Sequence, residues 1–164
     1  KLVAAVHDGP KIVTAAVRLI RGAKLLDVPV QATEQYPKGL GPTVAQVAEL
    51  LPERRSKLTF ACCSVPHVLE QLYGRQVRHV TLAGFEAHVC VAQTALDLLD
   101  LGFRVQVAAD AVGSRDPFDR DVALRRLEAA GAVISTVEAV LFEWCETADR
   151  PEFKAISALV KERT

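Results

Sequence analysis

Cys90 is the residue of this 164-residue chain whose position best suits chemistry. An apolar, β-branched run over 77–85 predicts a buried strand before it, and apolar residues at helical spacing over 89–101 predict a helix that begins around it. A thiol on the first turn of a helix lies near a partial positive charge and unpaired backbone N–H groups, and both favour the thiolate. The pattern therefore makes Cys90 a candidate nucleophile. The alternative is a structural role, because a cysteine between Val89 and Val91 also suits a small buried hydrophobic residue.

The elements that must position Cys90 alternate between strands and helices. Strands are expected at 28–33, 58–62, 77–85, 104–109 and 132–136. Helices are expected at 12–27, 44–51, 65–73, 89–101, 117–130, 137–147 and 151–161, with a Pro/Gly-rich loop at 35–42. This alternation predicts a three-layer, Rossmann-like α/β domain with a mainly parallel sheet and helices on both faces. Sites in such folds form at the carboxyl ends of strands, so the segments that follow the strands should converge on one rim.

The composition narrows the classes of function. Half of the residues are hydrophobic and 24% are charged, which is typical of one globular domain of this length. The formal net charge is zero and no apolar run reaches the length of a membrane span, so neither a nucleic acid nor a membrane is indicated as a partner. The four cysteines fit no zinc pattern and are too few for a disulfide scaffold, which favours a cytoplasmic or organellar, reducing compartment. No signal peptide is visible, although the chain starts with Lys1 and a targeting segment could have been lost.

Several segments resemble the isochorismatase-like cysteine hydrolases. Residues 84–91 match the family pattern G-x-E-x-x-x-C-V, and further segments of one branch are matched at Ala32–Thr43, Lys57–Phe60, Asp110–Arg115 and Pro151–Ser157. The string T-E-Q-Y-P-K-G-L-G is the most specific of these, because a run that long rarely matches by chance. The resemblance covers essentially the whole chain and implies a single isochorismatase-like hydrolase domain over 1–164.

The family acts through an Asp, a Lys and a Cys, and two of these have matches here. The resemblance implies that Cys90 is the nucleophile and that Lys57 is its cationic neighbour, which would lower the pKa of the thiol and hold a carboxylate. Without the resemblance, Lys57 reads as the solvated end of the charged run over 53–57.

The resemblance also implies an oxyanion site and a substrate pocket. It places a non-proline cis peptide at Phe85–Glu86, with the backbone N–H of Glu86 aimed at the oxyanion. The Glu86 side chain by itself suits a carboxylate at a helix N-terminus, and the two roles are compatible. The candidate pocket residues are Gln35, Tyr36 and Phe60, and the alternative for each is ordinary loop or core packing.

The family's Asp has no counterpart in this sequence. It lies on the first strand in a hydrophobic-hydrophobic-D-x-Q pattern, whereas Leu2–Val6 looks like the segment that follows that strand, so we expect a helical or irregular connection there. Asp8 is a poor substitute, because it sits in the turn before Gly9 and Pro10. We expect the central first strand to exist in the natural protein and to be missing from this sequence, and we expect the chain without that base to be inactive.

Metal and cofactor chemistry is not indicated. Relatives that hydrolyse nicotinamide carry an Asp/His metal cluster near the second strand, whereas the region 32–37 has no histidine here. We therefore expect no metal site and no cofactor. His88 lies two residues before Cys90, on a different helical face, which favours a structural or interface role.

The sequence therefore predicts a cysteine hydrolase of a small-molecule amide, C–N or ester substrate, acting through Cys90, Lys57 and an upstream Asp. A catalytically silent binding or scaffold protein of the same fold is the alternative, which the missing Asp favours. A third hypothesis is a redox sensor that uses Cys62, Cys63 or Cys90.

The resemblance further implies that the protein forms a homo-oligomer. The apolar helix surface over 137–144 is the candidate contact region. The alternative is that Val140, Leu141 and Trp144 pack on the sheet.

Overall fold

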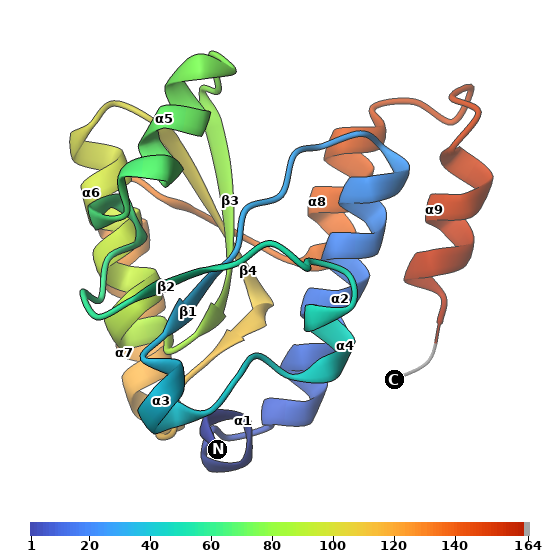
Figure 1. Cartoon of the computed structure of the whole chain (residues 1–164). Coiled ribbons are helices and arrows are strands. Elements are labelled where there is room, and N and C mark those ends of the chain that lie inside the picture. Colours follow the sequence, from blue (N-terminus) through green and yellow to red (C-terminus); the bar gives the residue numbers. More distant parts are fainter. Residues whose placement is uncertain (163–164) are drawn as a thin grey trace.

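The structure, a computed structural model, describes residues 1–162 and contains two parallel sheets in that range (Figure 1). In the smaller sheet β1 (Thr33–Gln35) pairs with β2 (Arg55–Lys57). In the larger sheet β4 (Arg104–Gly113) pairs with both β3 (His79–Phe85) and β5 (Val133–Ser135). The parallel pairing confirms the predicted α/β class. Within residues 1–162, however, the single sheet expected from the sequence is divided into two.

Helices connect the strands, as parallel pairing requires. The α-helices of the described range are α1 (Leu2–Ala5), α2 (Gly9–Leu25), α3 (Pro37–Leu40), α4 (Ala45–Ala48), α5 (Pro66–Gly74), α6 (Ala92–Asp100), α7 (Pro117–Ala129), α8 (Val137–Cys145) and α9 (Phe153–Val160). Two turns of other types lie near the carboxyl ends of strands. They are the 3₁₀ turn η1 (Cys62–Ser64), which follows β2, and the π-turn η2 (Ala87–Val91), which follows β3.

The larger sheet is covered by helices on both faces because β4 is apolar on both sides. Val107 packs in a core cluster with Leu98 of α6 and Leu127 of α7. Its neighbour Ala108 points to the other face and packs in a second cluster with Leu141 of α8. Figure 1 shows α6 and α7 on one side of the sheet and α2, α8 and α9 on the other. These three layers confirm the predicted Rossmann-like arrangement.

Two predicted strands are misplaced. The strand expected at 28–33 begins only at Thr33, and Pro29 within that range has no N–H to donate to a ladder. The strand expected at 58–62 is instead an irregular segment that leads into η1. The carbonyl groups of residues 59 and 60 accept hydrogen bonds from the Lys57 ammonium, so they are not available to a neighbouring strand.

Three further expectations concern the start of the chain, the loop at 35–42 and the helix surface at 137–144. The start of the chain is helical, as α1, which confirms the reading of Leu2–Val6 as a connection. The loop expected at 35–42 contains the short helix α3. In the proposed contact region over 137–144, Val140 and Leu141 are fully buried in the second core cluster, as the packing alternative expected, whereas Phe142 is 37% exposed, so the contact region itself stays a prediction.

Candidate active site

Cys90 and Lys57 lie side by side, although 33 residues separate them in the sequence. The Lys57 Nζ is 3.6 Å from the Cys90 Sγ. Lys57 is the last residue of β2, and Cys90 lies in η2, directly after β3. The carboxyl ends of strands from the two sheets therefore bring the two side chains together, as predicted. The reading of Lys57 as a solvated residue is wrong, because Lys57 is only 7% exposed.

Acceptors surround the buried Lys57 ammonium. It donates to Gln35 Oε1 at 2.6 Å, to the Phe60 carbonyl at 2.6 Å and to the Thr59 carbonyl at 3.1 Å. Gln35 is held there because it stands opposite Lys57 in the β1–β2 register. A buried charge needs such partners, since desolvation otherwise disfavours it strongly. The irregular segment after β2 thus supplies two carbonyl acceptors that hold the ammonium in place.

Gln35 also contacts the nucleophile candidate. The Cys90 thiol lies 3.8 Å from Gln35 Oε1 and donates toward it. The Gln35 amide nitrogen donates to the Leu58 carbonyl at 2.8 Å, which holds the side chain in place. Gln35 is therefore part of the Lys57–Cys90 cluster.

The expectation of a thiolate-favouring position for Cys90 is wrong in its net effect. Burial raises the pKa of the Cys90 thiol, and this outweighs Lys57 and a backbone hydrogen bond from Glu86, which both lower it. The predicted helix N-terminus is also displaced, because α6 begins only at Ala92 and Cys90 lies in the preceding π-turn. The thiol is the favoured form at neutral pH, so the cysteine needs a base to become a nucleophile.

Glu86 uses its backbone and its side chain for separate contacts. The Phe85–Glu86 peptide is cis, as the resemblance implied. The Glu86 backbone is among the groups that lower the pKa of the Cys90 thiol, although burial outweighs it. The Glu86 carboxylate makes no helix-capping bond and accepts from the backbone N–H of Arg115 at 3.2 Å and from its guanidinium at 2.9 Å.

Thr94 is a site residue that the sequence reasoning missed. It lies on α6, is 3% exposed, and donates its hydroxyl to the Cys90 carbonyl at 2.6 Å. The same oxygen accepts the backbone N–H of Cys62 at 2.9 Å. Thr94 therefore ties the cysteine turn to η1. A hydroxyl four residues after the nucleophile on an apolar helix face was the only signal in the sequence.

His88 has structural contacts, as the sequence favoured. Its Nδ1 is 2.9 Å from the hydroxyl of the buried Ser114, and its Nε2 is 3.7 Å from the Asp119 carboxylate. These contacts join η2 to the residues after β4 and to α7.

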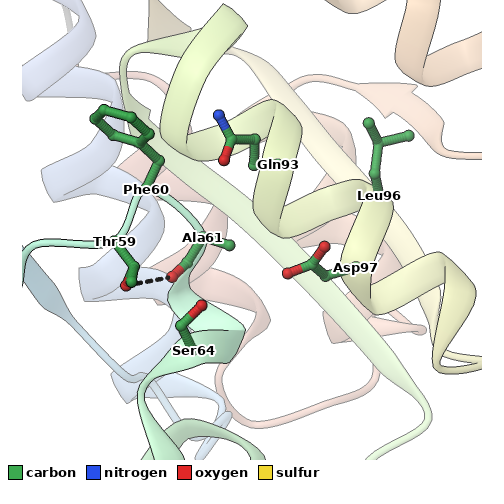
Figure 2. A pocket seen from close by; sticks show the side chains of 7 residues that line it. All are labelled: Thr59, Phe60, Ala61, Ser64, Gln93, Leu96 and Asp97. Atoms are coloured by element: carbon green, nitrogen blue, oxygen red, sulfur yellow. Dashed lines mark hydrogen bonds between the residues drawn. The ribbon is translucent and has the colours of Figure 1, made fainter.

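A cavity of about 450 Å³ lies beside this cluster, between the segment after β2 and α6 (Figure 2). Phe60, a candidate substrate-pocket residue, is one of its lining residues. Gln35 and Tyr36 are not among its lining residues. Tyr36 is 48% exposed, and its ring packs against Gly39 in α3, which corresponds to the alternative of ordinary loop packing.

The described residues also bear on metal binding, membrane crossing and the state of the cysteines. In residues 1–162, no group of three or more His, Cys, Asp or Glu side chains is arranged to hold a metal ion. None of the helices in this range has the length and apolar character required to cross a bilayer. All four cysteines are free thiols.

The fold and the arrangement of Lys57 and Cys90 define an isochorismatase-like α/β protein. The chain belongs to the isochorismatase family: the family model described as "Isochorismatase domain" matches residues 1–139. Isochorismatase domain-containing protein 2 of Macaca fascicularis is 48% identical over 155 residues, which span 93% of this chain and 74% of that protein.

Solved structures agree with this assignment. A structure described as MAR1 ribonuclease from Caenorhabditis elegans has a TM-score of 0.92 and 41% identity, and covers 97% of this chain and 83% of that one. The YcaC gene product of Escherichia coli, described as an octameric hydrolase of unknown specificity, has a TM-score of 0.84 and 24% identity. That match covers 92% of this chain and 75% of the other, and shows the same fold. Membership of this family fits a hydrolase.

Proposed function

We propose that this protein is a cysteine hydrolase that attacks the carbonyl carbon of a small amide, C–N or ester substrate with the Cys90 sulfur. The observation that carries the proposal is the 3.6 Å contact between the buried Lys57 ammonium and the Cys90 Sγ. A C–S bond forms first, and the carbonyl electron pair moves to oxygen, where the Glu86 N–H is suited to receive it. The C–N or C–O bond then breaks, and water hydrolyses the resulting acyl-thioenzyme.

The proposal requires a base, since the thiol has a raised pKa. The side chains within hydrogen-bonding reach of the Cys90 sulfur in residues 1–162 are Lys57 and Gln35, and neither is a carboxylate or an imidazole. An aspartate on the family's central first strand, which the resemblance implies, fits this need. The aspartate would take the thiol proton and return it to the leaving group.

An activity assay with nitrophenyl esters and anilides of short carboxylic acids tests the function. The chain is assayed alone and with an N-terminal strand of the hydrophobic-hydrophobic-D-x-Q pattern added. We expect turnover only with the added aspartate, and its loss in Cys90→Ser. An RNA oligonucleotide serves as a comparison substrate, because the Caenorhabditis elegans relative is described as a ribonuclease. Cys90-dependent cleavage of RNA with no cleavage of any ester or anilide would overturn the proposal.

The silent scaffold remains the alternative, and one observation favours it: in residues 1–162 no carboxylate contacts the Cys90 sulfur. The outcome of the aspartate experiment separates the two functions.

A reducing, cytoplasmic location is part of the proposal and is supported by the four free thiols. Self-association is proposed as well, because the Escherichia coli relative is described as octameric, and light scattering tests it.

A further inference from the structure

The cavity beside Cys90 carries a single charged side chain. Its lining residues are Thr59, Phe60, Ala61, Ser64, Gln93, Leu96 and Asp97. Of these, only Asp97 ionises. Its volume of about 450 Å³ falls in the range of small-ligand sites. The cavity therefore has apolar and hydroxyl walls and one negative charge.

The Asp97 carboxylate is directed into this space. Figure 2 shows it extending from α6 toward the turn that carries Ala61 and Ser64, while the Phe60 ring lies near the other end, beyond Gln93. In the described range Asp97 has no ion pair and no hydrogen bond through its side chain. Asp97 is half-buried and the pocket around it is open, so a cationic group of a ligand can approach and pair with its carboxylate.

The neighbouring groups do not neutralise this charge. The Lys57 ammonium is already bonded to Gln35 and to the Thr59 and Phe60 carbonyls. The Cys63 thiol is neutral, because burial raises its pKa to about 11, with Asp97 as a further cause. The negative charge is thus left for a ligand.

The cavity adjoins the proposed active site through the segment 59–60. The carbonyl groups of Thr59 and Phe60 bind Lys57, and the same two residues line the cavity. Asp97 lies on α6, the helix that directly follows the cysteine turn η2.

We propose that this cavity binds an organic ammonium group, with Asp97 as its counter-ion and Phe60 against the apolar part of the ligand. Resting on the proposed function, the site takes the end of the substrate remote from the carbonyl that Cys90 attacks. This site favours small amide or ester substrates that carry a cationic group, and it disfavours substrates that carry a carboxylate.

Binding is measured with a matched set of probes: benzylammonium, benzyl alcohol and benzoate. NMR titrations use the Cys90→Ser protein, so that the readout does not depend on catalysis. We expect benzylammonium to bind at least about fivefold more tightly than benzyl alcohol, as a partly exposed ion pair allows, and benzoate to bind most weakly. In Asp97→Asn the preference for the cation should disappear. Asp100→Asn removes an exposed carboxylate from the end of the same helix and should leave the preference unchanged.

The Ser64→Phe variant provides a second test, because it fills the cavity from η1 and leaves the Asp97 carboxylate itself in the sequence. It should weaken all three probes, and normal binding in it would place the site elsewhere. Equal affinity for benzylammonium and benzyl alcohol, or an equal effect of Asp97→Asn and Asp100→Asn, would overturn the inference. A protein that binds benzylammonium through Asp97 but hydrolyses nothing would refute the hydrolase proposal and leave this site standing.

Discussion

The two sides of the cysteine turn η2 are held in different ways. On one side Cys90 contacts a buried ammonium that has three oxygen acceptors. On the other side the Glu86 carboxylate pairs with Arg115, whose side chain is 63% exposed. Solvent screens the second interaction and hardly reaches the first. We therefore expect the proposed chemistry to depend on the Lys57 side, while the Arg115 side contributes modestly to the position of the turn.

The largest expected effect is the pH dependence of Cys90 alkylation. The thiolate is the reactive form, and burial raises the thiol pKa above that of an ordinary cysteine. The iodoacetamide rate at Cys90 should therefore rise about tenfold per pH unit from pH 6 to 8 and continue to rise beyond about 8.5, where a free cysteine levels off. Peptide mass spectrometry resolves Cys90 from Cys63, whose pKa of about 11 should keep its alkylation slow. A plateau at Cys90 below pH 8 would contradict the burial argument.

Removing the Lys57 ammonium should have the next largest effect. Lys57→Met leaves buried acceptors of Gln35, Thr59 and Phe60 without a donor, so the free energy of unfolding should fall by about 2–4 kcal/mol. The thiol pKa should rise further, and alkylation of Cys90 at pH 7 should slow. Urea unfolding measures the stability, with the exposed Lys154→Met as the control. Equal stability losses in the two variants would show that the buried contacts do not matter.

Thr94 should show an intermediate effect. Thr94→Val removes both bonds between the cysteine turn and η1, and should destabilise the fold by about 1–3 kcal/mol, whereas Thr94→Ser should restore most of this. Thr14 makes the same local bond, to the Pro10 carbonyl at 3.0 Å, but on an exposed surface. Thr14→Val is therefore the matched control and should lose little. Thermal unfolding of the variants decides whether the bond to Cys62 adds anything to the local one.

The smallest effect is expected at Arg115. Arg115→Ala removes an exposed partner of Glu86, so stability should change by at most about 1 kcal/mol, and the alkylation rate of Cys90 should stay within twofold or so of the parent. High salt should reduce even this difference. A loss as large as that in Lys57→Met would erase the contrast between the two sides of the turn.

The sequence predicted the elements that depend on local pattern or on the family resemblance. Cys90 and Lys57 were brought together by motif matches and by the rule that parallel strands end on one rim, and the distance confirms this. The strand expected at 58–62 failed because its carbonyl groups turn toward Lys57, a preference that apolar periodicity does not contain.

The sequence alone also did not predict the net shift of the Cys90 pKa or the role of Thr94. The first depends on how far the folded chain buries the thiol, and the second on a bond from Thr94 to Cys62, 32 residues away. The cavity charge at Asp97 arises in the same way, because residues of two distant segments must first meet.

Trapping of the acyl-thioenzyme tests the central claim most directly. The chain with the added aspartate strand is mixed with a nitrophenyl ester, quenched in acid within seconds, and analysed by intact and peptide mass spectrometry. The account predicts one acyl group per chain, on Cys90, which disappears on longer incubation and is absent in Cys90→Ser. An acyl group on another residue, or ester hydrolysis that proceeds undiminished in Cys90→Ser, would contradict it.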